Sequence, residues 1–227
     1  MIKIDDRGEE EIAMFVECTH HREILISSAD ANEGSRVGGR APEAVAAANP
    51  RCPRCGGPVA YLLTLAADVL GEKIAAGNMA SLLYCRKFSC RNRSQRLIEG
   101  SALMVLVTEA SPRAAAASEI DAELAGRALT VGPLREDSRG EDGEVEVDYS
   151  KLGGQPSYIQ QGWSDATAKL AQAKGQEFLF QWSDRYPDDM EVEELPFAGG
   201  MVYVFCSIDP GSKLPRLAEL SAFWQNT

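Results

Sequence analysis

Four cysteines in the sequence have the spacing of ligands for a single metal ion. Cys52 and Cys55 form a C-x-x-C turn followed by two glycines, a pattern that lets two thiolates converge on one ion while backbone amides turn toward the sulfurs. Cys85 and Cys90 form a second, looser pair, and 29 residues separate Cys55 from Cys85. Zinc prefers four such soft ligands in a tetrahedron. The pattern therefore predicts a closed, structural zinc site.

Two other interpretations of these thiols stay open. A redox C-x-x-C would need a helix N-terminus to lower the thiol pKa, which Pro58 and the apolar run after it do not clearly provide. Ordinary buried or exposed thiols are the other alternative. We expect Cys206 to be a core residue on a strand. Cys18 lies near His20 and His21 and could offer ligands with them, although this pattern is more typical of an ordinary strand end.

A catalytic constellation is hard to find in this chain. His20 and His21 are the only histidines, and no nucleophile elbow, Walker A, G-x-G-x-x-G or H-E-x-x-H motif is present. The carboxylates lie in charge runs, which are usually solvated. We therefore predict that the protein is not an enzyme. The alternative is an enzyme with a cleft between two halves, for which Trp163 and Trp182 are candidate pocket residues, although both are more typical of a core.

Short apolar segments indicate the elements that must position these residues. Residues 59–66 form a nearly continuous apolar run, consistent with a buried strand or a helix. Segments rich in β-branched and aromatic residues predict further strands at 12–18, 23–27, 79–84, 102–107, 177–182 and 201–207. Helices are predicted within 111–126 and 164–174, and residues 217–223 fit either structure. The pattern favours a β-rich α+β fold.

Three stretches of sequence recur in the same order. Residues 35–42 resemble 150–156, residues 61–65 resemble 178–182, and residues 79–85 resemble 200–206, at offsets of 115, 117 and 121. We interpret this as an internal duplication of a β unit, with both halves packed into one compact body. The first repeat would span 1–110, an Ala-rich and acidic linker 111–149, and the second repeat 150–227. Similar strand composition and chance glycines are the alternative.

A pair of glycines marks the start of each proposed repeat. Gly38 and Gly39 stand in the first, and Gly153 and Gly154 in the second, where Pro156 follows. Glycine adopts positive φ and admits a close backbone approach that a side chain would block. We therefore expect a tight backbone turn at both places.

The net charge of −11 is distributed unevenly. Residues 136–149 carry a charge of −6 and residues 184–194 carry −5, whereas residues 85–96 carry +5 without an acid. The second acidic segment contains Asp184, Asp188, Asp189, Glu191, Glu193 and Glu194, and the basic segment contains Arg86, Lys87, Arg91, Arg93 and Arg96. This balance disfavours a surface that binds nucleic acid or anionic lipid all over. The acidic segments either attract a basic partner or are simply solvated.

The sequence also predicts a cytoplasmic location without membrane contact. No run approaches the roughly 20 apolar residues that cross a bilayer, and the first residues show no apolar signal-peptide core. The cytosol keeps thiols reduced, as a cysteine metal site requires.

The motifs SRVGG-x-x-P, CPRCGGPVAYLLTL, LLYCRKFSC, SKLGGQP and MVYVFC together resemble the bacterial YwqG-like family, whose function is unknown. They also resemble the related programmed-cell-death-protein-2 family and its yeast ribosome-maturation relative. The resemblance covers residues 35–96 and 150–206 and places all four cysteines on the cysteine positions of that pattern. It departs from the pattern at Arg36, a lysine in the family, at the extra residue Ala41, and at Thr64, a glutamine in the family. The second copy lacks the C-x-x-C.

The resemblance implies a duplicated β-rich domain and, in the eukaryotic relatives, a chaperone of a small-subunit ribosomal protein. We therefore expect a zinc-stabilised protein-binding module, chaperone-like or neutralising, for a basic partner, with a ribosomal protein as one candidate. One alternative is an RNA-binding protein that uses residues 86–96, with Phe88 stacking on a base, unless these cations pair with the acidic segments. A further alternative is an immunity protein against a toxin. The sequence does not fix the oligomeric state.

Overall fold

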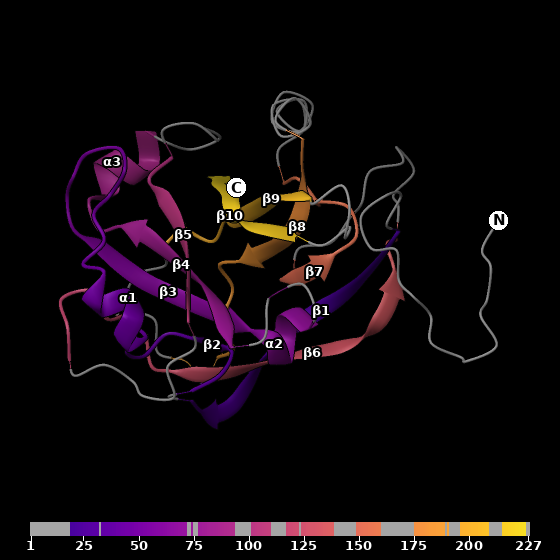
Figure 1. The fold of residues 1–227 in the computed structure, drawn as a ribbon. Helices are drawn as coiled ribbons and strands as arrows, with labels where there is room; N and C mark the ends of the chain where they lie inside the picture. The colour runs from indigo at the N-terminus through magenta and orange to yellow at the C-terminus, as the bar shows by residue number, and fades with distance from the viewer. Residues whose placement is uncertain are drawn as a thin grey trace.

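The computed structural model describes residues 19–31, 33–71, 74, 77–93, 101–109, 117–122, 124–138, 149–159, 175–188, 190, 196–208 and 215–225. This part of the chain forms one antiparallel sheet and three short helices (Figure 1). The strands are β1 (His20–Asp30), β2 (Arg36–Val37), β3 (Val59–Ala66), β4 (Asn78–Cys85), β5 (Leu103–Glu109), β6 (Arg127–Glu136), β7 (Lys151–Gly153), β8 (Gln176–Ser183), β9 (Met201–Ile208) and β10 (Pro215–Gln225). The helices are α1 (Glu43–Ala47), α2 (Ala67–Leu70) and α3 (Phe88–Arg93).

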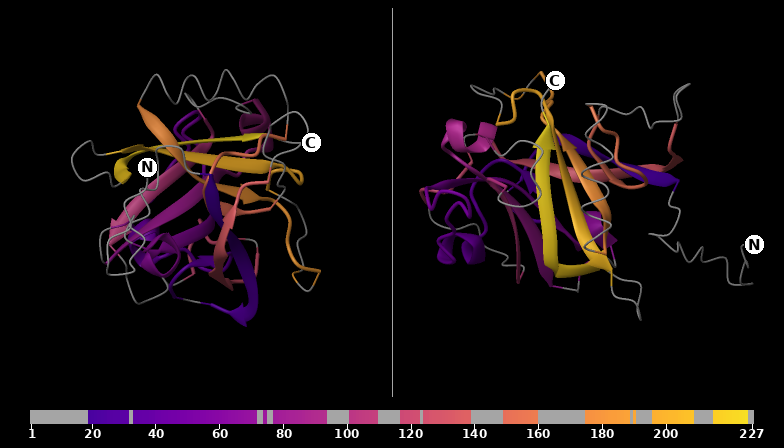
Figure 2. Two further views of the ribbon diagram at one scale, coloured as in Figure 1. Left: turned by 90° about the vertical axis from the view of Figure 1, so that its right-hand side faces the viewer. Right: turned by 90° about the horizontal axis from the view of Figure 1, so that it is seen from above.

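The sheet is nearly closed. Its strand order is β10-β9-β8-β7-β1-β6-β2-β3-β4-β5, and the two edge strands, β10 and β5, contact each other (Figures 1 and 2). This order has an internal symmetry. Reversing it and exchanging β1 with β6, β2 with β7, β3 with β8, β4 with β9 and β5 with β10 gives the same order again. β1 therefore pairs with β7, and β6 pairs with β2, so that the first strand of each half lies beside the other half.

The two halves of the sheet share details of register. Arg36 faces Thr64 across β2 and β3, and Lys151 faces Gln181 across β7 and β8. Each long hairpin has a register shift at one leucine, Leu62 in β3 and its counterpart in β8, Leu179. A bulge of this kind leaves one residue unpaired and increases the local twist, which helps a sheet to curl.

The serine contacts at the ends of these hairpins also correspond. The Ser35 hydroxyl accepts a hydrogen bond from Ala66 N at 2.8 Å, and the Ser150 hydroxyl accepts one from Ser183 N at 2.9 Å. The carbonyl oxygens of the same two serines accept bonds of 2.8 Å from strands β6 and β1, respectively. Each serine therefore ties the start of a short strand to two neighbouring strands.

The third recurring stretch is shifted by one residue from the alignment that the sequence suggested. Leu82 lies opposite Leu63, and Val204 lies opposite Phe180, so that Cys206 corresponds to Tyr84 and not to Cys85. The shift matters because one residue of slip turns a side chain to the other face of a sheet. Cys206 and Tyr84 both belong to the main core, whereas Cys85 lies in the smaller cluster around α1.

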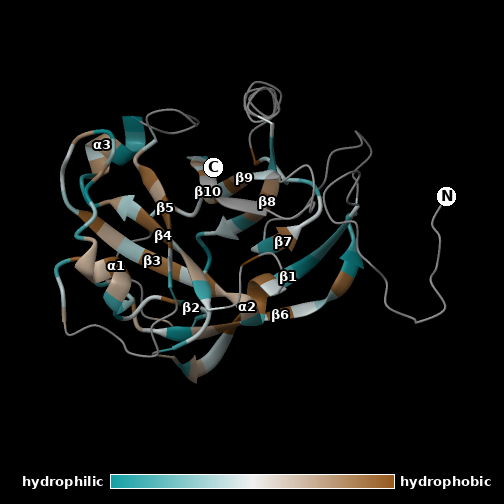
Figure 3. Ribbon diagram, in the orientation of Figure 1, coloured by the Kyte–Doolittle hydropathy of each residue, from teal (hydrophilic) through white to brown (hydrophobic). Residues whose placement is uncertain are grey.

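Apolar side chains on both faces explain why β3 and β4 read as continuous apolar runs (Figure 3). Inside the curled sheet, side chains such as Leu63, Leu65, Phe180 and Trp182 form the main core, which both halves share. On the other face, Val59, Tyr61, Leu83 and Cys85 pack in a second cluster with Val45 of α1. A third cluster around Phe178, Tyr203, Phe205 and Phe223 covers the same face of the second half.

The strand-rich prediction is confirmed for the described residues. Residues 59–66 form a strand, and residues 217–223 lie within β10. The Ala-rich segment forms no helix at 117–122 or 124–126, and residues 127–136, expected within the linker, form the central strand β6. The predicted strand at 12–18 and helix at 164–174 lie outside the described residues. None of the helices described in the structure is long and apolar enough to cross a membrane.

Candidate metal centre

A hairpin of two long strands brings the four predicted ligands to one place. β3 begins just after the C-x-x-C turn, and β4 ends at Cys85, which is the register partner of Val59. Arg51 and Pro58 form an isolated bridge across the turn itself, and Arg86 N donates to the Pro58 carbonyl at 3.1 Å. The antiparallel pairing thus returns the chain from Cys55 to Cys85, as the sequence suggested.

The C-x-x-C turn is closed by its own backbone. Cys52 N donates to the Gly57 carbonyl at 2.9 Å, and Gly56 N donates to the Cys52 carbonyl at 2.9 Å. Gly56 has a φ of +66°, a conformation that side chains with a Cβ rarely adopt. A Cβ on Gly57 would lie 3.2 Å from the Cys55 sulfur, so glycine leaves room beside the thiol.

Helix α3 supplies the fourth cysteine of the cluster. After β4 the chain forms the six-residue helix α3, with Cys90 N donating to the Lys87 carbonyl at 2.9 Å. The Sγ atoms of Cys52 and Cys90 lie 3.9 Å apart, and those of Cys55 and Cys85 lie 3.7 Å apart. All four sulfurs lie within 4.8 Å of one another. These separations exceed a disulfide bond, and the cluster could hold a metal ion.

The environment of the four thiols is uneven. Cys52, Cys85 and Cys90 are buried, whereas Cys55 is exposed. The Gly57 N–H, aided by the neighbouring thiols, lowers the pKa of Cys55 to about 7. Burial raises the pKa of both Cys85 and Cys90. Buried thiols resist ionisation unless a cation replaces their protons, and a bound metal ion does so.

The basic segment beside the cluster divides into exposed and buried cations. Arg86, Lys87 and Arg93 are exposed, whereas Arg96 lies outside the described residues. The prediction that Arg91 contacts phosphate was wrong, because this side chain is buried, with only 3% of the residue exposed. Its guanidinium donates to the Cys85 carbonyl at 2.7 Å and lies over the rings of Tyr84 and Phe88. Arg91 therefore stabilises the loops that carry the cysteines from a buried position.

The second acidic segment contains a similar exception. Asp184 is 1% exposed, and one of its carboxylate oxygens accepts hydrogen bonds from Phe197 N at 2.7 Å and Gly199 N at 3.3 Å. Burial raises its pKa to about 6. It ties the loop before β9 to the end of β8, and it cannot contact a partner as predicted. Asp188 is exposed, and the remaining acids, Asp189, Glu191, Glu193 and Glu194, lie outside the described residues.

The two glycine pairs adopt the predicted conformation. Gly38, Gly39, Gly153 and Gly154 have φ values of +71°, +73°, +76° and +71°. A Cβ on Gly38 would lie 2.3 Å from the Ala125 carbonyl oxygen. The pairs therefore permit a tight turn and a close approach of a neighbouring segment. Pro156, which follows the second pair, is partly buried.

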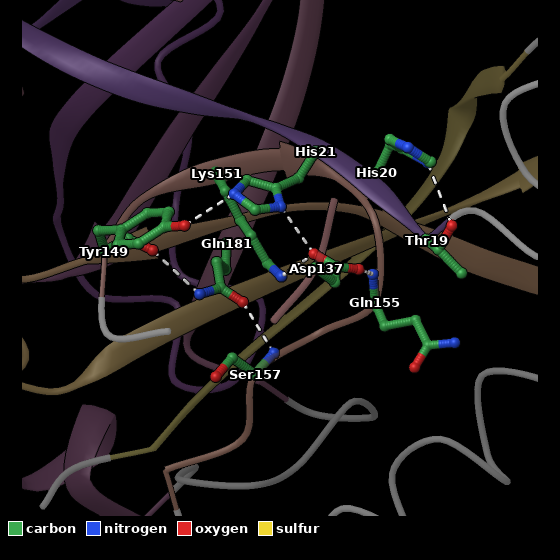
Figure 4. A network of polar contacts seen from close by, with 9 residues as sticks. All are labelled: Thr19, His20, His21, Asp137, Tyr149, Lys151, Gln155, Ser157 and Gln181. Carbon is green, nitrogen blue, oxygen red and sulfur yellow. Dashed lines mark hydrogen bonds and ion pairs between the residues drawn. The ribbon is translucent and has the colours of Figure 1, made fainter. Parts of the chain in front are cut away.

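A buried polar network at the junction of β1, β6 and β7 was not predicted from the sequence (Figure 4). Lys151, which is fully buried, donates to Asp137 Oδ1 at 3.0 Å. The same oxygen lies 2.7 Å from His21 Nδ1, and the other ring nitrogen of His21 lies 2.7 Å from the Tyr149 hydroxyl. The second carboxylate oxygen accepts from Gln155 N at 2.8 Å. The network joins the first strand of one half to the turn of the other.

The electrostatics of this network suit a structural role. Burial is the main cause that lowers the pKa of both His21 and Lys151, while Asp137 opposes the shift in each case. Gln181, which donates to the Tyr149 carbonyl at 3.0 Å and accepts from Ser157 N at 2.9 Å, continues the polar contacts beneath it. His21 lies at a strand end, as the sequence interpretation placed it, but its burial in this network was not foreseen. Asp137 was counted in an acidic segment that was either solvated or partner-binding, and it is buried.

Of the two candidate cleft residues, the structure describes one. Trp182 is fully buried in the main core, and Trp163 lies outside the described residues. Comparison of the chain with protein-family models gives no match, and comparison with curated proteins gives none either. Among the described residues, the four-cysteine cluster is the group that could hold a metal ion.

Proposed function

We propose that this chain is a zinc-stabilised protein-binding module and that its partner is a basic protein. The observation that carries the metal part is the spacing of the four sulfurs. A tetrahedral zinc site with Zn–S bonds of about 2.3 Å has sulfurs about 3.8 Å apart. The separations of 3.7 and 3.9 Å agree with that value. An all-sulfur set at this spacing favours zinc over hard cations, which prefer oxygen.

A structural role for zinc follows from the ligand set. Four cysteines complete the tetrahedron and leave no position for a water or substrate, as catalytic zinc requires. Cys52, Cys85 and Cys90 are buried beneath the loops that they join. The ion would hold the C-x-x-C turn and α3 against the end of the β3–β4 hairpin. In that position it organises a surface and does not perform a reaction.

Charge supports a basic partner. The chain carries −11 overall, and the residues from Asp184 to Glu194 contribute −5 of it. Asp184 is buried, and among the described acids of this segment Asp188 is the exposed one. Attraction between an acidic surface and a basic partner accelerates their association, and salt weakens this attraction by screening it. A chaperone or neutralising protein would use such a field to shield a basic client.

The resemblance to the YwqG-like and programmed-cell-death-protein-2 families supports the same proposal, as does an origin by internal duplication. The paired register of β2–β3 and β7–β8, the two leucine bulges and the two serine contacts favour such an origin. An experimental structure in which the halves superpose with Leu62 on Leu179 is the expected outcome. Halves that superpose only at another register would contradict it.

The metal part of the proposal is tested by elemental analysis of the full chain purified without added metal. One zinc per chain is expected, and Cys52→Ser and Cys90→Ser should each lower the zinc content. Cys206→Ser is the matched control, because this thiol is buried elsewhere and should leave the zinc content unchanged. Absence of zinc, or equal loss in the control, would contradict the proposal.

The partner is tested by co-purification at low and high salt. A basic protein should be recovered, and less of it as salt rises. A variant with Asp189, Glu191, Glu193 and Glu194 changed to Asn or Gln should lose most of the recovery. A control with Glu33, Glu43, Glu109 and Glu119 changed to Gln alters the net charge equally at exposed positions elsewhere. Equal recovery with both variants would count against the acidic segment as the binding surface.

A further inference from the structure

The loops that form the four-cysteine cluster also present a basic surface, which we define as Arg51, Arg54, Arg86, Lys87, Arg93 and Phe88. All six residues are exposed. Arg51 precedes the C-x-x-C turn, Arg54 lies within it, and Arg86 and Lys87 directly follow Cys85. Because the four sulfurs meet within 4.8 Å, these loops lie side by side. The sequence had suggested only the cations after Cys85, and the fold adds the two from the turn.

The number of cations exceeds what the metal centre itself needs. Four thiolates around a divalent ion carry a charge of −2. The two metal loops, residues 49–58 and 85–93, contain six Arg or Lys residues and no Asp or Glu. The six cations, buried Arg91 among them, together with a centre of −2 give a local charge of +4 on a chain whose total is −11. A local positive field in an acidic protein indicates a ligand of negative charge.

Phe88 gives this surface an aromatic platform. Its side chain is one of the large apolar groups that are strongly exposed, at 50%. The Phe88 ring is held by a cation–π contact, because the Arg91 guanidinium lies 5.4 Å from its centroid. The same guanidinium lies 5.1 Å from the centroid of the Tyr84 ring. Arg91 is in turn held by its hydrogen bond to the Cys85 carbonyl. Tyr84, Arg91 and Phe88 form a stack whose outermost layer faces solvent.

We propose that this basic surface binds single-stranded nucleic acid, with the cations on the phosphates and Phe88 stacked on a base. Cations beside an exposed aromatic ring are the combination that holds unpaired strands. A duplex hides the faces of its bases, and the helices in the described part of the chain, of four to six residues, are too short to read a major groove. The inference goes beyond the proposed function and rests on its metal part, because the charge balance and the test both use the bound ion.

The proposal is tested with the zinc-loaded full chain and labelled RNA of roughly 4 to 16 nucleotides, the usual size of such a site. Fluorescence anisotropy at several salt concentrations between about 50 and 200 mM gives both the affinity and its salt dependence. Single-stranded DNA of the same length distinguishes RNA from DNA as the ligand. Binding of the single strand tighter than that of a duplex of equal length is expected.

Variants separate the two contributions. Arg51→Gln, Arg54→Gln and Lys87→Gln together should weaken binding and reduce the slope of log affinity against log salt by about 2, since each phosphate contact on a single strand adds about 0.7. The charge-matched control carries Arg22→Gln, Arg135→Gln and Arg185→Gln. Phe88→Ala should weaken binding roughly tenfold, and Phe88→Tyr should restore it. Leu134→Ala removes an exposed apolar side chain elsewhere and should have no effect.

Three results would overturn the proposal. They are no binding at low salt, equal loss in the two triple variants, and duplex binding as tight as that of the single strand. Zinc content measured on every variant distinguishes a damaged metal centre from a lost contact. A chain that retains its zinc and its basic protein partner but binds no nucleic acid would refute this inference and leave the proposed function standing.

Discussion

Arg36 and Lys151 occupy equivalent places in the sheet but have different partners. Each begins the short strand that precedes a glycine pair, and each faces the corresponding residue of the next strand. Lys151 donates to a carboxylate, Asp137, whereas Arg36 donates to the carbonyls of Gly34 and Arg40 at 3.2 Å and lies over the Tyr61 ring. Among the described residues, no carboxylate pairs with Arg36. Each half therefore buries a cation at this place, but one cation is compensated by a carboxylate and the other by backbone carbonyls and a ring.

Breaking the Lys151–Asp137 pair should be strongly destabilising. Asp137→Asn or Lys151→Met alone leaves one charge buried without its counter-ion, a loss of about 3 to 5 kcal/mol in the free energy of unfolding. The double variant should lose less than the sum of the two, because neither charge then remains. Urea denaturation of the metal-loaded chain measures this. Arg127→Gln is the control, since its partner Asp30 is 86% exposed, and should lose less than about 1 kcal/mol.

Asp184 should make stability fall as the pH rises from about 4 to 6. Its pKa is raised from 3.8 to about 6 in the folded protein. Both states are protonated below pH 3.8, and above pH 6 the buried carboxylate is ionised at a loss of about 3 kcal/mol relative to the unfolded chain. Asp184→Asn should remove this dependence. The pKa of His21 is lowered, which acts in the opposite direction, so the difference between wild type and variant at each pH is the informative quantity.

The metal cluster could be predicted because its signals are local. Ligand type and the spacing of a C-x-x-C turn are visible in a few residues, and the recurring apolar stretches indicated strands that would return the chain to it. The face of each strand was harder to predict. The bulges at Leu62 and Leu179 shift the register, and the alignment that matched Cys206 to Cys85 could not include them.

The buried charges could not be predicted, because they depend on contacts between distant segments. Asp137 is one of seven acids between Glu136 and Tyr149, and nothing in that run identifies the acid that meets Lys151 and His21. Asp184 could not be distinguished from the other acids of its segment for the same reason. Arg91 adjoins a ligand in a six-residue helix, too short for periodicity to show which face is buried.

Glycine replacements should separate conformational strain from steric contact. Gly38→Ala places a Cβ 2.3 Å from the Ala125 carbonyl oxygen, in addition to the strain of its φ of +71°. Gly56→Ala has a similar φ of +66° but meets nothing within 4 Å. We expect a loss of about 1 to 2 kcal/mol for Gly56→Ala and a clearly larger loss for Gly38→Ala. Thermal unfolding of the two variants checks this, and equal losses would mean that the segment at Ala125 moves freely.

Metal removal should loosen the contact between the two halves of the sheet as well as the metal loops. Trp224 in β10 donates from its indole nitrogen to the Arg91 carbonyl at 3.2 Å, and Arg91 follows Cys90 in α3. The Trp224 ring also packs on Phe197, which packs on Tyr84 of β4. A metal ion that fixes α3 would therefore also fix the hydrogen-bond partner of Trp224, which belongs to one of the two edge strands that contact each other.

Chelation of the metal should accordingly shift tryptophan fluorescence to longer wavelength and weaken it, because Trp224 is fully buried in the intact protein. Trp224→Phe should lose most of that response, whereas Trp182→Phe should keep most of it, since the hydrogen bond to the Arg91 carbonyl of α3 comes from Trp224. Readdition of zinc should restore the signal if the chain stays folded. A fluorescence response carried entirely by Trp182 would mean that the core opens first. The metal would then stabilise the hairpin of β3 and β4 without stabilising the contact between the edge strands β10 and β5.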